Sequence, residues 1–194
     1  METIAFTVTG IEPLLQNNPQ TVDPLNKYSK LRSEITSKRK KTDDDILELR
    51  RLDIESKTYY DDQIGVYIPA TWVTAAIGGV SWSKAKIKKA DIRSTVFTTE
   101  SKIPLKFAGM DKVKKRVDIA GNPEFQQVML LKQGQVKVAK NAPIFRDWSF
   151  SSEIEFDPNM INRKELQGLL SHAALYGGFG DFRPTYGRAQ VAFE

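Results

Sequence analysis

A glycine-rich loop close to the C-terminal end combines three residue types that suit a polyanion. Glycine lets the backbone N–H groups approach a phosphate, because it has no side chain to block the approach. Arginine neutralises phosphate charge, and aromatic rings stack on bases. The loop therefore predicts contact with a nucleic acid through Gly177, Gly178, Phe179, Gly180, Phe182, Arg183, Tyr186, Gly187 and Arg188.

The aromatic residues of this loop also allow a structural interpretation. Phe179, Phe182 and Tyr186 are large enough to fill a core, and a buried ring cannot stack on a base. In that case the loop is a tight turn, and Arg183 and Arg188 alone make the predicted contacts.

Basic residues gather in three further stretches of a chain with 29 Lys and Arg, 24 Asp and Glu, and a net charge of +5. Segregated positive charge indicates a polyanionic partner, although lysine runs also occur on solvated helix faces. Lys84, Lys86, Lys88 and Lys89 form one cluster. The predicted nucleic-acid contacts come from the other two, Lys38, Arg39, Lys40 and Lys41, and Lys112, Lys114, Lys115 and Arg116.

Groups suited to catalysis are sparse. The chain has no cysteine and one histidine, His172, which excludes thiol chemistry and a histidine-rich metal site. The acidic run Asp43–Asp45 follows Thr42, where a helix cap and the helix dipole account for it. We expect no enzyme activity, no metal and no cofactor. The alternative is a metal-dependent nuclease that uses Asp23, Asp61 or Asp181.

Length and composition indicate one globular domain. The chain has 194 residues and is 40% hydrophobic and 27% charged. No apolar run is long enough to span a bilayer, and residues 1–3 lack the pattern of a signal peptide. These features predict a cytoplasmic protein with no membrane partner.

Strand and helix patterns near the two ends of the chain indicate which elements flank this loop. Residues 3–9 alternate as a strand with one buried face, and residues 149–156 do the same. A helix over 162–176 has Asn162 and Glu165 as its capping box and Gly177 as its left-handed end. The loop follows, and a last strand covers 189–193.

The middle of the chain predicts helices first and strands later. Helices are expected over 24–38, with Leu25 on its apolar face, over 43–60, and from Pro69 onward. Gly78-Gly79 is expected to interrupt the third helix. Strands are expected over 64–68, 93–99, 103–107, 117–120, 128–131 and 136–139, with a turn at Gln133-Gly134.

The order of elements predicts an α+β fold. It is a ferredoxin/RRM-like antiparallel sheet with helices on one face, forming a single domain over residues 1–194. A basic helical insertion is expected over about residues 24–62, and a β-rich insertion that includes a hairpin over about residues 91–140.

The helix, the G-G-x-G-x-x-R-P-x-x-G-R loop and the terminal strand resemble the C-terminal part of the RAMP superfamily. That superfamily has an RRM-like core and includes backbone subunits of CRISPR effector complexes; its glycine-rich loop commonly faces RNA. The matching positions are Gly177, Gly178, Gly180, Arg183, Gly187 and Arg188. Because Arg183-Pro184 departs from the usual form of the loop, an uncharacterised phage-encoded relative is also expected.

Two further expectations concern partners. The protein is expected to coat single-stranded RNA or DNA, or a guide-containing strand, and to assemble side by side as a homo-oligomer or filament. The alternatives are the nuclease above and a phage assembly or inhibitor protein that binds a protein partner. The sequence does not separate RNA from DNA.

Overall fold

The computed structural model describes residues 1–194, apart from the side chains of residues 131–133. The chain divides into two compact units. The first comprises Met1–Leu14, Val66–Ala108 and Phe145–Glu194, and the second comprises Leu15–Gly65 and Gly109–Ile144. The described residues form six α-helices together with antiparallel strands, so the mixed α/β class with antiparallel sheets is confirmed.

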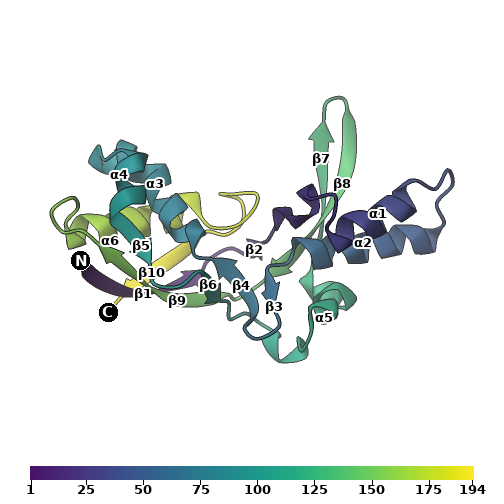
Figure 1. Ribbon diagram of the computed structural model, residues 1–194, viewed down its shortest axis with the longest axis horizontal. Coiled ribbons are helices and arrows are strands. Elements are labelled where there is room, and N and C mark those ends of the chain that lie inside the picture. Colours follow the sequence, from purple (N-terminus) through teal and green to yellow (C-terminus); the bar gives the residue numbers. More distant parts are fainter. The chain divides into compact units, whose positions relative to one another are not determined.

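The first unit is built on a four-stranded antiparallel sheet. Its strands are β1 (Glu2–Gly10), β5 (Val96–Thr98), β9 (Ser149–Phe156) and β10 (Ala189–Phe193), in the order β10-β1-β9-β5. Helices α3 (Thr71–Ala85) and α6 (Arg163–His172) cover one face of it (Figure 1). A π-helical turn, Ala173–Gly177, extends α6, and α4 (Lys89–Thr95) follows α3. Strands β4 (Gly65–Pro69) and β6 (Lys102–Pro104) pair antiparallel.

The alternation of apolar residues sets the register of this sheet. Ile4, Phe6 and Val8 are buried on the helix-covered face of β1, and Val8 pairs with Phe150 of β9. Burying each such side chain contributes about 1.5–3 kcal/mol, and a slip of one residue would turn all of them to solvent. The expected strands at 3–9 and 149–156 are confirmed.

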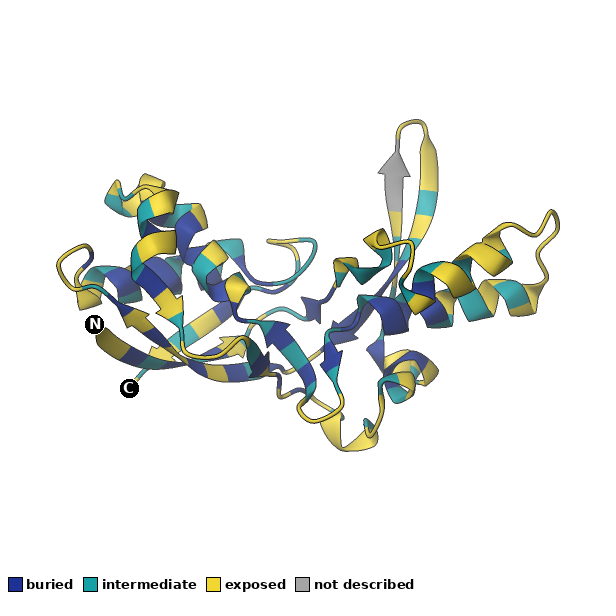
Figure 2. Ribbon diagram, viewed as in Figure 1, coloured by how far each residue is buried: buried dark blue, intermediate teal, exposed yellow. Residues whose placement is uncertain are grey.

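The opposite face of the sheet is polar. Ser151, Glu153 and Glu155 of β9 are exposed there, and the Thr7 hydroxyl lies 2.8 Å from that of Ser151. Phe97 of β5 is 45% exposed and pairs with Glu155. RRM domains stack bases on aromatic rings of the open sheet face. In this chain the aromatic residues of β1 and β9, which are Phe6, Phe150 and Phe156, are buried instead. Buried residues alternate with more exposed ones along both strands (Figure 2).

The second unit contains helices α1 (Lys27–Thr36), α2 (Asp43–Lys57) and α5 (Arg116–Gly121) and the hairpin of β7 (Gln126–Gln133) and β8 (Val136–Phe145). Short strands β2 (Leu14–Leu15) and β3 (Tyr60–Asp61) and 3-10 turns at Pro19–Val22, Met110–Lys112 and Pro123–Phe125 complete it. The first residue of β2, Leu14, and the last residue of β8, Phe145, belong to the first unit. The hairpin turn at Gly134 is confirmed, since that residue has a φ of +61°.

Local capping signals predicted helix starts correctly. The Thr42 hydroxyl accepts a hydrogen bond from the Asp45 amide, and the Asp45 carboxylate accepts one from the Thr42 amide. Asn162 accepts a bond of 2.8 Å from the amide of Glu165. Such a cap stabilises a helix by about 1 kcal/mol. The expected helix over 43–60 ends earlier, at Lys57.

Several expected elements differ in the structure. Pro69 ends β4, and α3 begins at Thr71 and continues through Gly78-Gly79 without a break, because its apolar side is buried in the core of the first unit. Residues 117–120 belong to helix α5, and 93–95 to helix α4. Leu25 lies before α1 and is 74% exposed. The residue with a positive φ after the π-helical turn is Gly178, with a φ of +75°, and not Gly177 as expected.

None of the helices in the described part of the chain is both long enough and apolar enough to cross a bilayer.

Candidate nucleic-acid interface

The glycine-rich loop of the first unit is held by its own backbone. The amide of Gly178 donates to the carbonyl of Ala173, that of Phe179 to Gly187, and that of Gly187 to Pro13, each at 2.8 Å. These three N–H groups are therefore used within the protein and are not available to a phosphate.

Steric contact explains two of the glycines. Gly187 has a φ of +77°, and a Cβ there would lie 1.8 Å from the carbonyl oxygen of Phe179. Gly178 has a φ of +75°, and a Cβ there would lie 2.8 Å from the backbone of Gly187. Only glycine allows the two ends of the loop to approach this closely. Both glycines are therefore needed to shape the loop.

Phe179 belongs to the core of the first unit. Its side chain is 1% exposed, and its ring packs edge-on against Trp148 at 6.3 Å and Phe150 at 5.5 Å. Its expected role in stacking on a base is therefore corrected, because the side chain is almost completely buried. Phe182 and Tyr186 are half-buried.

The two arginines of the loop differ. Arg188 donates to the Glu12 carboxylate at 2.8 Å, and its carbonyl accepts from the amides of Ile11 and Glu12. Arg183 is exposed, and among the described residues its guanidinium donates one hydrogen bond, to the carbonyl of Gly178 at 3.4 Å. Arg188 thus ties the loop to the segment after β1, while Arg183 keeps most of its donors for a ligand.

An open groove of about 600 Å³ runs between α3 and this loop. One wall is the α3 surface formed by Ala75, Ala76, Gly79 and Val80, whose small side chains leave the space. Lys89 and Arg183 supply positive charge, and Asp181 supplies a carboxylate. The remaining lining residues are Ala173, Gly177, Gly178, Gly180, Phe182 and Pro184.

The lysine cluster over residues 84–89 was not among the predicted contact residues, yet one of its members, Lys89, lines the groove. Lys89 lies across α3 at Gly78, where a Cβ would come within 3.1 Å of the Lys89 Cγ. Among the described residues, no carboxylate forms an ion pair with Lys84, Lys86, Lys88, Lys89, Arg93 or Arg183. The cluster is visible in the sequence, but the position of Lys89 in the same groove as Arg183 depends on the packing of α3 against the loop.

The predicted contacts at Lys38–Lys41 and Lys112–Arg116 lie in the second unit, and several are occupied there. Lys38 donates to Asp45 at 2.6 Å and thereby holds the pKa of that carboxyl below its usual value. Lys41 donates to the Lys38 carbonyl at 3.1 Å. Lys112 pairs with Glu124 at 2.7 Å, which raises the lysine's pKa. Arg39 and Lys40 are exposed in the turn between α1 and α2.

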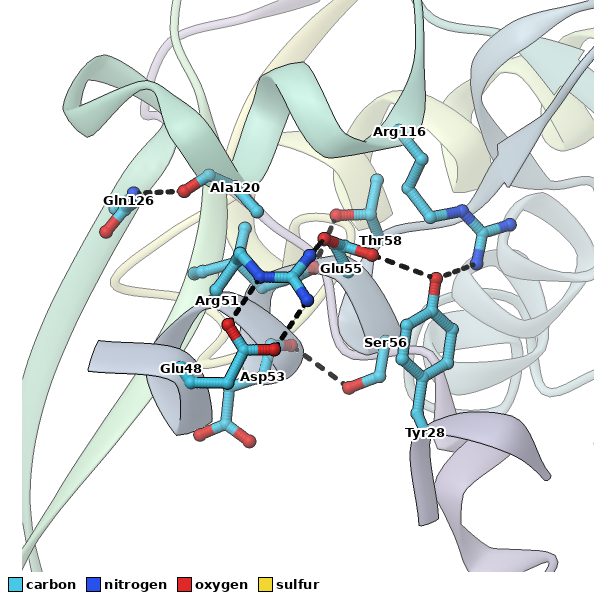
Figure 3. Close-up of polar contacts among 11 residues, drawn as sticks. Tyr28, Glu48, Arg51, Asp53, Glu55, Ser56, Thr58, Arg116, Ala120 and Gln126 are labelled. Carbon is cyan, nitrogen blue, oxygen red and sulfur yellow. Dashed lines mark hydrogen bonds and ion pairs between the residues drawn. The ribbon is translucent and has the colours of Figure 1, made fainter. Parts of the chain in front are cut away.

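Arg116 has a structural role (Figure 3). Its guanidinium donates to the Tyr28 hydroxyl at 3.2 Å and to the Tyr60 carbonyl at 2.8 Å. The buried Tyr28 hydroxyl in turn donates to Glu55, which also accepts from Arg51. These bonds join α1, α2 and α5, so Arg116 holds the second unit together.

The side chains of Lys114 and Lys115 remain exposed beside this network. Their backbone amides both donate to Asp118 at 2.8 Å, and these two bonds lower the pKa of its carboxyl. The geometry of this turn therefore depends on Asp118, while the two ammonium groups are available to solvent.

The acidic residues named for the nuclease alternative accept hydrogen bonds within local turns. Asp23 accepts from the amide of Leu25, and Asp61 from the amide of Gln63, each at 2.9 Å. Asp181 accepts from the amide of Phe182 at 3.1 Å. Within the described residues, no three acidic or histidine side chains are grouped so that they could hold a metal ion.

Comparison with known proteins adds no family assignment. No protein-family model matches the chain, and no curated protein is significantly similar to it.

Proposed function

We propose that the protein binds single-stranded RNA or DNA along the groove between α3 and the loop over 177–188. One observation carries the proposal: Lys89 and Arg183, far apart in the sequence, line the same groove, and neither forms an ion pair with a described carboxylate. Exposed cations without acidic partners attract a polyanion, and small wall residues leave room for its backbone.

The resemblance to the RAMP superfamily is part of the same proposal. What supports it is the strand order β10-β1-β9-β5 with two helices on one face, which is the order expected of a ferredoxin-like split β-α-β core. Residues 15–65 and 109–144 would then be insertions between elements of that core. The open face of the sheet is polar, and the aromatic residues of β1 and β9 are buried beneath it. Nucleic acid is therefore proposed to bind on the helix-covered side, next to the loop.

The test is a binding titration with a labelled oligonucleotide at low and moderate salt. The double variant Lys89→Ala/Arg183→Ala is expected to bind at least tenfold more weakly, since each charge-assisted contact contributes about 1.5–3 kcal/mol. The slope of log K against log salt should fall by about 0.7 for each lost contact with a single strand.

Lys114→Ala/Lys115→Ala is the matched control, because it removes two exposed lysines from the second unit. It should change affinity less than threefold, roughly what non-specific charge contributes. Equal losses in the two double variants, with both proteins folded, would contradict the groove as the site. Absence of any binding at low salt would overturn the proposed function and favour a protein partner.

The same titration tests two further expectations, assembly along the strand and nuclease activity. More than one chain bound per long oligonucleotide would support assembly along the strand. Cleavage of the oligonucleotide after Mg²⁺ is added would support the nuclease alternative instead, and Asp181→Asn would then test the acid nearest the groove.

A further inference from the structure

One side of α3 carries a stripe of four residues, two of which line the groove. Trp72, Ala75, Gly79 and Trp82 follow one another at spacings of three, four and three residues, so they lie on one side of the helix. Ala75 and Gly79 line the groove, and Trp72 and Ala75 also line a smaller cavity of about 70 Å³ beside Arg183. The stripe is about 15 Å long at 1.5 Å per residue. It has small residues in the middle and an indole at each end.

Trp82, at the far end of this stripe, is exposed to water. It is 58% exposed, whereas Trp148 in the core of the same unit is 1% exposed. The Lys86 ammonium lies 5.9 Å from the centre of the Trp82 ring. A cation covers at most one face of an indole, so much of this large apolar surface remains open to solvent.

The surroundings of Trp82 are strongly basic. Residues 83–93 contain Lys84, Lys86, Lys88, Lys89 and Arg93 against one acid, Asp91. A helix dipole favours cations at the end of α3, which accounts for Lys84 and Lys86. The dipole disfavours cations at the start of α4, where Lys88 and Lys89 stand. Helix stability therefore leaves these two lysines unexplained, whereas an anionic partner accounts for all five cations.

We propose that Trp82 is a stacking platform for an unpaired base and that it makes the site selective for single strands over duplexes. This inference rests on the proposed function and specifies its ligand. A base within a duplex already stacks on its neighbours and presents only its edges in the grooves. An exposed indole among cations therefore receives a base only from a strand whose bases can be splayed out, while the lysines bind its phosphates.

The experiment compares two labelled ligands, an oligothymidylate of about 15 nucleotides and a duplex of similar length. Trp82→Ala is expected to weaken binding of the single strand about 5- to 150-fold, because stacking on one base contributes about 1–3 kcal/mol. Binding of the duplex should change less than about twofold. Trp82→Phe should retain part of the affinity for the single strand.

Phe97→Ala is the control variant. Phe97 is also a partly exposed aromatic residue of the first unit, but it lies on the polar face of the sheet. It should alter neither affinity. Single-strand binding should also quench Trp82 fluorescence, and this quenching should be absent in Trp82→Phe.

The outcomes separate the two proposals. If the unmodified protein binds neither ligand, the proposed function fails. If it binds both and Trp82→Ala weakens both equally or neither, the stacking inference fails while the groove remains as an electrostatic site. A loss confined to the single strand, with Phe97→Ala unchanged, supports the inference.

Discussion

The two units of this chain use their cations in different ways. The second unit has seventeen Lys and Arg against thirteen Asp and Glu, and the first has twelve against eleven. By charge alone the second unit is the better candidate for a polyanion. Yet several of its cations are held in internal ion pairs and hydrogen bonds. In the groove of the first unit, neither Lys89 nor Arg183 forms an ion pair with a described carboxylate. For this reason the site is proposed from what each cation is paired with, and not from the number of cations in each unit.

The network around α2 shows what pairing achieves. Arg51 donates to Glu48 at 2.6 Å and also binds Glu55, and the bond to Glu48 raises the pKa of Arg51 above its usual value. Arg32 pairs with Asp53, and Lys57 donates to the Asn141 carbonyl at 2.6 Å. A polyanion would have to displace these acids before it could bind the same cations, so the network favours folding over ligand binding.

The largest difference between the units should appear in the free energy of unfolding when one arginine in each is replaced by alanine. Arg116→Ala removes the donor to Tyr28 and Tyr60, and we expect it to lower the free energy of unfolding by about 2 kcal/mol. Arg183→Ala should change that free energy by less than about 0.5 kcal/mol, because the side chain is exposed. Urea denaturation measures both.

The binding titration should give the reverse order. Arg183→Ala is expected to weaken binding about tenfold, and Arg116→Ala to leave it unchanged within about twofold under conditions in which it is folded. Arg116→Lys controls for charge, since lysine keeps the positive charge but not the fork that reaches two acceptors. If Arg116→Ala also weakened binding tenfold, the division between paired and unpaired cations would be wrong.

Local signals in the sequence predicted much of the fold. The alternation at 3–9 and 149–156 and the caps at Thr42 and Asn162 depend on residues close in sequence, and all are confirmed. The break at Gly78-Gly79 was wrong because tertiary packing overrides the low helix propensity of glycine. Val73 and Ile77 are fully buried on the inner side of α3, and that burial holds the helix together.

The candidate site depended on contacts that no local pattern contains. The pairing of Arg116 with Tyr28 spans 88 residues, so the sequence could not show that this arginine is occupied. The burial of Phe179 follows from its contacts with Trp148 and Phe150. Lys89 stood in a cluster visible in the sequence, but only the packing of α3 against the loop shows that it lies near Arg183.

Substitutions of Gly79 in the groove wall should have smaller effects on stability and on nucleic-acid binding. Gly79 lies in the middle of α3, and a Cβ there would meet no atom within 4 Å. Gly79→Ala should therefore stabilise the protein by up to about 1 kcal/mol through helix propensity. Gly79→Glu should keep part of that gain and weaken nucleic-acid binding, because its carboxylate would project into the groove. Thermal unfolding and the titration measure the two effects.

Gly168 provides the matched control on α6. It is also exposed in a helix, and its Cβ would likewise meet nothing within 4 Å. Gly168→Ala should stabilise the protein by a similar amount, and Gly168→Glu should leave binding nearly unchanged. Equal loss of affinity in Gly79→Glu and Gly168→Glu would mean that net charge, and not the groove, governs binding.

The smallest effect concerns His172, the one histidine of the chain. Partial burial, and next the positive charge of Lys84, hold its pKa below the ordinary value of 6.5. The folded state therefore resists protonation, and its stability should fall as the pH drops below about 6.5 and through the lowered pKa of the folded protein. His172→Gln should reduce this loss, as measured by urea denaturation between neutral and mildly acidic pH.

The same histidine reports on the groove, because a phosphate near Lys84 would offset the charge that opposes protonation. Its ring protons give one resolvable set of NMR signals, and their titration should shift to higher pH when a single-stranded oligonucleotide is bound. Lys84→Ala should raise the pKa of the free protein and reduce the further shift on binding. A bound oligonucleotide that leaves this titration unchanged would place the strand away from the end of α3, and the cations there would then need another explanation.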